Sequence, residues 1–465
     1  MLFSSTVFIF IFLPAVLLGY YGILRGNRAR NILLLAASLL FYAWGEPVYV
    51  FLMLGSIAGN YGFGLLLKRT ARKKGVLVFA VIFNLGILFY FKYLNFAVEN
   101  INALFGTALS VPPVSLPIGI SFFSFQAMSY VIDVYRGTAE VQRNPLDLGL
   151  YISFFPQLIA GPIVRYNTIA EQIGRRSVDP ESFQGGVCRF LRGLAKKIIL
   201  ANNLSLAAER AFSLAGAGEI TMAMAWLGSL SYTFQIYFDF SGYSDLAIGL
   251  GAMFGFRFEE NFNFPYLSRS VSEFWNRWHI SLGRWFRDYV YFPMGGSRVA
   301  KGKMLRNLFT VWLLTGIWHG AAWQFIVWGL GYGVIISLEK LSGFPRNCRS
   351  RLLRILYACL TFLIVNAGWV LFGAQSLSAA LVQLRAMCGF GAVPDLTAAF
   401  YWEEYGPLFV LAAFFSTPLL KNALARIGQG RGWPVVRALV YTLLLLLCVS
   451  YLAMGAHNPF IYFTF

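Results

Sequence analysis

Long apolar runs, separated by short polar turns, recur along the whole chain. A transmembrane helix needs roughly 20 apolar residues, and most of the runs are close to that length. No soluble domain or disordered linker is evident between them, so we expect a single integral-membrane domain over 1–465. The pattern predicts an all-α polytopic membrane protein with spans at about 4–24, 31–48, 49–67, 75–92, 116–135, 219–240, 355–373, 407–420 and 438–455.

Two segments depart from this pattern. Segment 145–164 contains FFPQLIAGPI, in which Pro156, Gly161 and Pro162 predict a broken or re-entrant element. Such backbone is tolerated at membrane depth only where protein buries it or a wet cavity meets it. Segment 307–338 has no Asp, Glu, Lys or Arg, yet it is too short for two crossings of about 20 residues each. Its glycines would permit close packing or a bend: Gly316, Gly320, Gly329 and Gly331.

A helical period runs through 275–289. We expect one amphipathic helix in the membrane interface, with His279 on its inward, aromatic face. That face carries Trp275, His279, Leu282, Phe286 and Tyr289, and the other side carries Arg277, Arg284 and Asp288.

Charge narrows the class of protein. Only 12% of the residues are charged, against about 25% in a soluble domain. Basic residues follow the first run at 25–30, so the positive-inside rule places the N-terminus outside. The net charge of +18 gathers at 68–74, 189–197, 298–306, 346–354 and 421–437. These clusters set topology and attract anionic lipid, and they can at the same time form a cytoplasmic mouth that collects a phosphate-bearing donor.

Several kinds of site are disfavoured. The five cysteines include no CxxC pair, so neither a disulfide framework nor a metal site is expected. The chain has no phosphate-binding loop, dinucleotide fingerprint or GxSxG elbow, which disfavours ATP-driven pumping and serine hydrolase chemistry. Membrane lipid is an expected partner, and nucleic acid is not.

Two histidines are the leading candidates for chemistry. His319 lies in the charge-free segment 307–338, and an ionisable group at membrane depth is by default a hypothesis for a functional site. With no acid near it in sequence it should be neutral, and neutral imidazole is a competent base. His279 lies among Trp275, Trp278 and Trp285, as at a membrane–water boundary. The alternative for each is a buried, hydrogen-bonded ring with no part in a reaction.

Polar residues in apolar runs give a weaker signal. Asp239 and Asp245 occur with Gln235, Ser241 and Ser244 around the string YFDFSGYSDLAIG. Unpaired carboxylates there would protonate or find partners. They form either a hydrogen-bonded brace between helices or the lining of a tunnel.

Several strings resemble the membrane-bound O-acyltransferase family, MBOAT, and most closely its bacterial branch of alginate O-acetyltransferase membrane proteins and D-alanyl-teichoic-acid transfer proteins. The resemblance covers nearly the whole chain. The strings are LPIGISFFSFQAMSYVIDVYRG (116–137), FFPQLIAGPI (154–163), YFDFSGYSDLAIG (237–249), NFNFPYLSRSVSEFWNRWHISLGRWFRDYVYFPMGGSR (261–298), IWHG (317–320) and the closing PFIYFTF.

This resemblance implies about eleven spans, with re-entrant and interfacial helices, around a funnel or tunnel, and a catalytic core at about 116–340. It implies transfer of an acyl group from a cytoplasmic thioester to an acceptor reached from outside. The family's catalytic histidine falls on His319, and a second motif position, usually His or Asn, falls on His279. The PMGGSR string favours acetyl transfer over D-alanyl transfer.

We therefore expect an O-acetyltransferase of the bacterial inner membrane that uses acetyl-coenzyme A and has no permanently bound cofactor. A periplasmic acetyltransferase that decorates an exopolysaccharide such as alginate is the expected partner. The donor's phosphates would meet Arg298, Lys301, Lys303 and Arg306. The substrate tunnel would be lined by Trp275, Asn276, Trp278, Trp318, Gln235, Asp239 and Ser241.

Three alternatives stay open at this point. D-alanyl transfer to teichoic acid would use the same fold. A flippase or channel for a polysaccharide or lipid-linked glycan would fit the apolar spans and would need no particular imidazole. A scaffold for a periplasmic transferase would tolerate the loss of both histidines.

Overall fold

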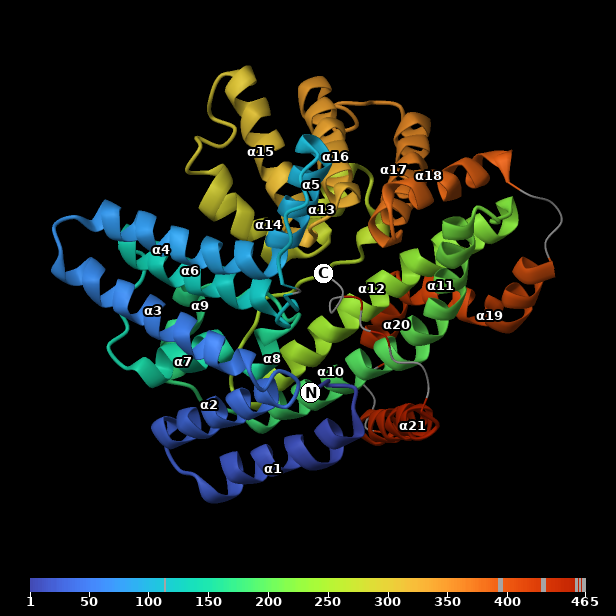
Figure 1. Cartoon of the computed structure of the whole chain (residues 1–465). Helices are drawn as coiled ribbons and strands as arrows, with labels where there is room; N and C mark the ends of the chain where they lie inside the picture. Colours follow the sequence, from blue (N-terminus) through green and yellow to red (C-terminus); the bar gives the residue numbers. More distant parts are fainter. Residues whose placement is uncertain (113, 392–395, 428–431, 456–458, 460, 462–465) are drawn as a thin grey trace. The chain divides into compact units, whose positions relative to one another are not determined.

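The computed structural model describes the chain except residues 113, 392–395, 428–431, 456–458, 460 and 462–465. The described residues form helices and no β-strand (Figure 1), which confirms the all-α prediction. The chain divides into two compact units. The first unit comprises Met1–Phe190 and Tyr243–Glu259, and the second comprises Leu191–Gly242 and Glu260–Phe465. The expectation of a single membrane domain stays a prediction.

The first unit is built from the N-terminal helices. Its centre is α6, whose residues from Ile120 to Val131 are all buried and which packs against α3 and α4. Its helices are α1 (Leu13–Leu17), α2 (Asn27–Ala43), α3 (Tyr49–Arg69), α4 (Lys73–Leu88), α5 (Leu94–Phe105), α6 (Ile120–Arg136), α7 (Pro145–Ser153), α8 (Phe155–Leu158), α9 (Tyr166–Gly174) and most of α10 (Pro180–Ala195).

A reciprocal amide pair joins α3 to α4. Asn60 Nδ2 donates to Asn84 Oδ1 at 3.0 Å, and Asn84 Nδ2 donates to Asn60 Oδ1 at 2.8 Å. Both side chains are buried. Interhelical polar contacts of this kind hold spans together where lipid removes the hydrophobic driving force.

The predicted break in 145–164 is confirmed. Helix α7 ends at Ser153, Phe154 has a non-helical backbone, and α8 is a single turn from Phe155 to Leu158. Phe155 N finds its hydrogen-bond acceptor in the hydroxyl of Ser38 at 3.0 Å. The protein interior thus satisfies backbone that the break leaves without a helical partner, as irregular backbone in a buried place requires.

The second unit contains both candidate histidines. Residues Met222–Gly242 of α12 belong to it, and the rest of that helix belongs to the first unit. Its helices are α11 (Asn202–Ala217), α12 (Met222–Met253), α13 (Val271–Arg277), α14 (Ile280–Phe286), α15 (Lys301–His319), α16 (Trp323–Ser342), α17 (Arg351–Gly373), α18 (Leu377–Arg385), α19 (Leu396–Phe415), α20 (Leu419–Ile427) and α21 (Trp433–Ala453).

Segment 307–338 folds into the helical hairpin α15–α16, whose two arms lie side by side (Figure 1). Their backbones touch at two glycines. A Cβ on Gly316 would lie 2.4 Å from Phe325 O, and one on Gly329 would lie 2.5 Å from Trp312 O. Only glycine allows this approach, so the expected close packing is found there. Gly331, by contrast, meets no atom within 4 Å.

Five helices are long and apolar enough to cross a membrane, or six if the bent pair in 397–426 is one span; this search covers the described residues only. The expected count of about eleven spans is not confirmed. Helix α21 shows the character of these helices most plainly, since Leu439, Leu443 and Leu446 are all exposed. So large an apolar surface would be costly in water, and it fits the hydrocarbon of a bilayer.

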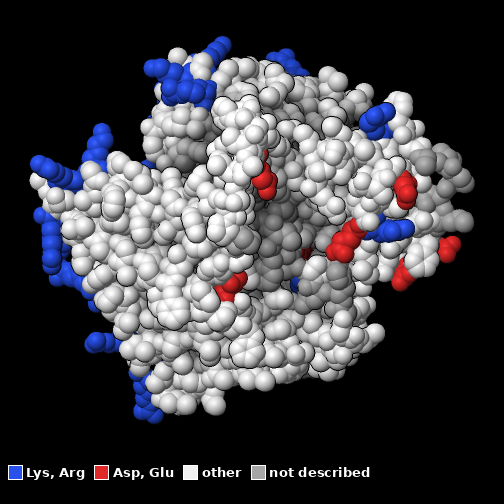
Figure 2. Space-filling model, in the orientation of Figure 1, with Lys and Arg blue, Asp and Glu red and all other residues white. Residues whose placement is uncertain are grey.

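On α3, α4 and α15 the basic residues gather at helix ends rather than along helix sides. Figure 2 shows Lys and Arg at the turn between α3 and α4, while the sides of these two helices are free of them. A second group lies over the start of α15 (Figure 2). This is the distribution expected where charged ends meet the membrane surface and apolar sides meet lipid.

Candidate active site

His319 is the last residue of α15 and is only 4% exposed. Its ring is surrounded by aromatic rings from three helices. The ring centroids lie 4.9 Å from Trp318 of α15, 5.1 Å from Trp328 of α16 and 5.0 Å from Phe372 of α17. Each contact is nearly edge-to-face. The hairpin packing at Gly316, one turn earlier, fixes where this ring lies.

His279 is 2% exposed, and its tautomer follows from its partner. Asn261 Oδ1 accepts from the backbone N–H of Ser281 at 3.1 Å, so this atom is the amide oxygen. The same oxygen lies 3.2 Å from His279 Nδ1, which must therefore carry the proton. His279 Nε2 is left as an acceptor, and it is buried with no hydrogen-bond partner among the described residues.

The two histidines meet the same indole. Trp318 lies 4.9 Å from His319 and 6.1 Å from His279, measured between ring centroids. Phe240 of α12 also contacts His279, edge-to-face at 4.6 Å between centroids. The structure therefore brings His279, His319 and Trp318 together in one buried aromatic cluster of the second unit.

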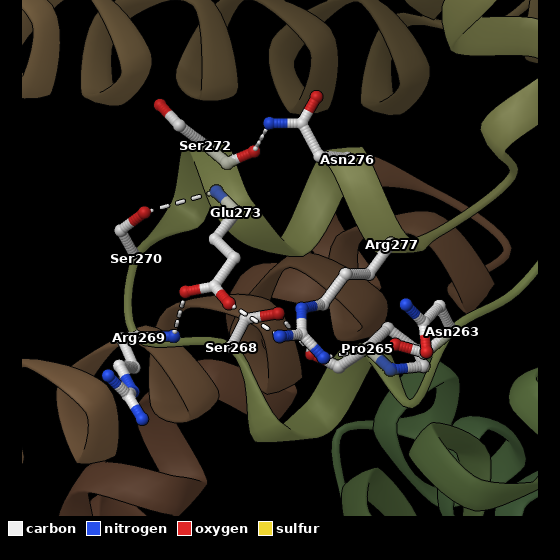
Figure 3. Close-up of polar contacts among 9 residues, drawn as sticks. All are labelled: Asn263, Pro265, Ser268, Arg269, Ser270, Ser272, Glu273, Asn276 and Arg277. Atoms are coloured by element: carbon white, nitrogen blue, oxygen red, sulfur yellow. Dashed lines mark hydrogen bonds and ion pairs between the residues drawn. The ribbon is translucent and has the colours of Figure 1, made fainter.

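Helix α13 immediately precedes His279 in the chain. Side chains at the start of α13 cap that helix (Figure 3). The Ser270 hydroxyl accepts from Glu273 N at 3.0 Å, and Glu273 Oε2 accepts from Arg269 N at 2.9 Å. This is a variant of the capping box, in which the glutamate accepts from the residue before the N-cap Ser270. At the other end Arg277 pairs with Glu273 at 2.8 Å and donates to Asn263 O at 3.3 Å.

The prediction of one helix over 275–289 is wrong. Helix α13 ends at Arg277 and α14 begins at Ile280, and His279 lies between them with φ 44° and ψ 52°. This left-handed conformation is uncommon outside glycine, with asparagine, aspartate and histidine the usual exceptions. It ends α13 and turns the imidazole toward Asn261, which a continuous helix would not have done.

Two further tunnel candidates lie in the same cluster. Trp275 contacts Trp312, Trp328 and Tyr332 at 5.0, 5.3 and 4.9 Å between centroids. Trp278 is buried and packs on Trp369 with its ring tilted by 46° and the centroids 4.7 Å apart; the neighbour of Trp369, Phe372, contacts His319. A lining role for either indole stays a prediction.

The candidates on α12 are buried, and one of them has a charged partner. Asp239 Oδ1 lies 2.6 Å from Lys197 Nζ, and its Oδ2 accepts from Ile461 N at 3.0 Å. Gln235 and Ser241 are buried as well. The expectation that a carboxylate in this apolar setting would find a partner is thus met for Asp239.

The remaining candidates lie away from the histidines. Asn276 is exposed, and its amide donates to Ser272 O at 2.9 Å. The side chains of the four basic candidates are exposed near the start of α15: Arg298, Lys301, Lys303 and Arg306. His319 is thirteen helical positions after Arg306, which is about 20 Å at 1.5 Å per residue.

Sequence reasoning missed several neighbours of the histidines. Asn261 fixes the tautomer of His279, and Trp328 and Phe372 pack on His319. The only available sign for Asn261 was its place in the string NFNFPY, close before His279. Trp328 and Phe372 looked like ordinary aromatic residues of apolar helices.

Acidification is expected to destabilise the protein through His279. Burial lowers the pKa of His279 to about 3, whereas the ring titrates near 6.5 in an unfolded chain. Between these values the unfolded chain binds more protons, so stability is complete above pH 6.5 and falls as the pH drops toward 3. At 1.36 kcal/mol per pH unit the loss by pH 5 is about 2 kcal/mol.

Thermal unfolding in detergent at pH 8, 6.5 and 5 measures this loss. His279→Asn is the matched control, because asparagine also accepts a left-handed backbone and has no titrating ring. Parallel curves for the two proteins would show that His279 is not held neutral by the fold.

The fold and the site together define a helical, polytopic membrane protein with two imidazoles buried around one indole. A family model described as "MBOAT, membrane-bound O-acyltransferase family" matches residues 139–348. The "Probable alginate O-acetylase AlgI" of Pseudomonas putida is 42% identical over 100% of both chains. The "Peptidoglycan O-acetyltransferase" of Helicobacter pylori is 38% identical over 84% of this chain and 81% of its own.

A more distant relative is the "Teichoic acid D-alanyltransferase" of Bacillus subtilis, 30% identical over 56% of this chain and 69% of its own. The chain belongs to the membrane-bound O-acyltransferase family and is an acyltransferase. The alternatives of a flippase, a channel or a scaffold protein therefore do not describe its class.

Proposed function

We propose that this protein transfers an acetyl group from acetyl-coenzyme A, bound on the cytoplasmic side of the bacterial inner membrane, to an acceptor on the other side. The observation that carries the proposal is the burial of His319 and His279 around Trp318 in a chain similar along its whole length to an alginate O-acetylase. The N-terminus would lie outside.

The two imidazoles would have different tasks. His319 takes the proton from a hydroxyl group, whose oxygen attacks the acyl carbon, and the departing thiolate receives the proton from the imidazolium. General-base assistance of this kind contributes roughly 10²–10⁴-fold. His279, with Nδ1–H held by Asn261, offers its Nε2 to orient the donor or to assist the proton transfer.

Indole N–H groups support a binding role for the aromatic cluster. The N–H groups of Trp275 and Trp328 are buried and have no acceptor within the described part of the chain. A buried donor without an acceptor costs about 1–3 kcal/mol. A carbonyl oxygen of the donor would satisfy such a group, and the surrounding rings would keep competing water away.

The relatives support a polysaccharide outside the cytoplasm as the final acceptor. Two of them are named for the O-acetylation of alginate or peptidoglycan and match over at least 84% of this chain, whereas the D-alanyl relative matches over 56%. We therefore favour acetyl transfer, with a periplasmic partner that places the group on a polymer such as alginate.

Purified protein incubated with radiolabelled acetyl-coenzyme A tests this function. Label should appear on a candidate periplasmic acetyltransferase or on its polymer when both are supplied, and unlabelled D-alanyl thioester should not compete. Absence of transfer with every thioester and partner offered would overturn the proposal.

Charge reversal at Lys301 and Lys303 is expected to raise the KM for acetyl-coenzyme A. The basic start of α15 carries no side-chain cap, and free N–H groups there would add to the attraction for the donor's phosphates. At about 0.2–1 kcal/mol per exposed ion pair, two reversals should raise KM roughly tenfold. Acetyl-pantetheine, which lacks phosphates, is the control, and an equal rise with both donors would contradict a phosphate contact.

A further inference from the structure

A buried carboxylate from α16 holds the start of the helix that leads to His279. Glu339 is 8% exposed. Its Oε1 accepts from Val271 N at 2.7 Å, and its Oε2 accepts from Ser272 N at 2.8 Å. Tyr357 of α17 donates its hydroxyl to the same Oε1 at 2.8 Å. One side chain thus joins α13, α16 and α17.

The carboxylate of Glu339 supplies hydrogen-bond acceptors that α13 cannot supply to its own first N–H groups. The first N–H groups of a helix have no acceptor within it, and Val271 is fully buried, away from water. The capping box in Figure 3 provides acceptors for Arg269 N and Glu273 N. Val271 N and Ser272 N are left to Glu339, whose negative charge also suits the positive end of a helix.

The other end of α13 is held by the chain segment before it. Asn263 N donates to Arg277 O at 2.9 Å, and Ile280 N donates to Asn261 O at 3.0 Å. Helix α13 has only seven residues, too few to be stable alone. Its position, and that of His279 two residues beyond it, therefore depends on tertiary contacts: the ring packing of Trp275 and these two polar attachments.

We propose that Glu339 is a positioning residue for acyl transfer. By fixing the start of α13 to α16 and α17, it sets the imidazole of His279 against Trp318, next to His319. Glu339 contacts neither imidazole and no substrate in this role. The expected effect on the rate rests on the proposed function. The expected effect on the position of α13 and His279 can be tested without any activity.

Glu339→Gln is the sharpest variant. Glutamine keeps the size of the side chain, but its single oxygen can serve one of the two N–H groups, and its NH2 faces the other. We expect kcat for acetyl transfer to fall about tenfold or more, as for the loss of a hydrogen bond to a charged group, with an unchanged KM for acetyl-coenzyme A. Tyr357→Phe leaves both N–H bonds in place and should lower kcat by about two- to threefold.

Glu273→Gln is the matched control. It weakens the internal cap and the pair with Arg277 on the same helix (Figure 3), but leaves the bonds of Glu339 intact. Its kcat should stay within about twofold of wild type, as for other partly exposed ion pairs. An equal loss of kcat in Glu273→Gln and Glu339→Gln would overturn a positioning role.

A double-mutant cycle tests whether Glu339 acts through His279. Where His279→Asn has already removed the imidazole, Glu339→Gln should cost less than it does in wild type, because coupled residues are not additive. Independent, multiplicative losses would overturn the proposal.

Amide hydrogen exchange gives a readout that needs no activity. Glu339→Gln should speed exchange at Ile280 and Ser281, next to His279, and Glu273→Gln should not. Faster exchange confined to Val271 and Ser272 would show a local cap and overturn the proposal. Failure of the acyl-transfer function itself would appear separately, as an absence of labelled product with the wild-type protein.

Discussion

His319→Ala is expected to lower acyl transfer by roughly 10²–10⁴-fold, the usual contribution of a general base. The substitution removes the imidazole but leaves α15 and its glycine contacts with α16 in place, so the protein should still fold and reach the membrane. The measurement is the rate of labelled acetyl transfer per mole of folded protein. In cells, product acetylation should be lost while polymer export continues.

Phe372→Leu is the packing control for this prediction. It removes one of the aromatic rings that contact His319 but leaves the base itself. Its rate should fall by less than about tenfold, within the range of a lost packing contact. A His319→Ala protein that kept a tenth or more of the wild-type rate would show that the reaction does not depend on this imidazole.

Asp239→Ala is expected to have the largest effect on stability. The Lys197–Asp239 pair is almost completely buried, at 4% and 2% exposure of the side chains. Removing one partner of such a pair leaves an uncompensated charge and costs about 3–5 kcal/mol. The substitution also takes an acceptor from Ile461 N.

Thermal unfolding in detergent measures this loss, and a double variant identifies its cause. Lys197→Met with Asp239→Leu replaces both charges by apolar groups, so most of the stability should return. Arg287→Ala, which breaks the exposed pair with Asp288, should cost less than about 1 kcal/mol. If the double variant were as unstable as Asp239→Ala, the uncompensated charge would not be the cause.

Many of the long apolar helices could be predicted because their apolar runs are long and their interruptions are marked, whereas α10 and α11 were not predicted. The break at FFPQLIAGPI was visible from Pro156 and Gly161, and the close packing of α15 on α16 was visible from Gly316 and Gly329. In each case the deciding information lies in neighbouring residues. The same holds for His319, which stands out as an ionisable residue in a charge-free stretch.

The details around His279 depend on residues far apart in the chain. Aromatic and apolar residues recur every three or four positions through 275–289, as in a continuous helix. The hydrogen bonds of Asn261 nevertheless hold His279 in a left-handed conformation, which this spacing does not reveal. The partners of Asp239 and of the first residues of α13 are likewise distant in sequence. Lys197, the partner of Asp239, lies on an earlier helical segment, and Glu339 follows Val271 by 68 residues. Such partners are chosen by tertiary packing.

The left-handed backbone at His279 also restricts which mutations this position can accept over evolution. A residue with an ordinary Cβ would pay about 1–2 kcal/mol to hold that conformation, so asparagine and glycine are the cheap replacements. Of these, asparagine keeps a polar side chain but cannot exchange a proton. Replacement by asparagine would therefore keep the turn and lose the second imidazole, and the proposed general base His319 would then be the remaining imidazole of this cluster.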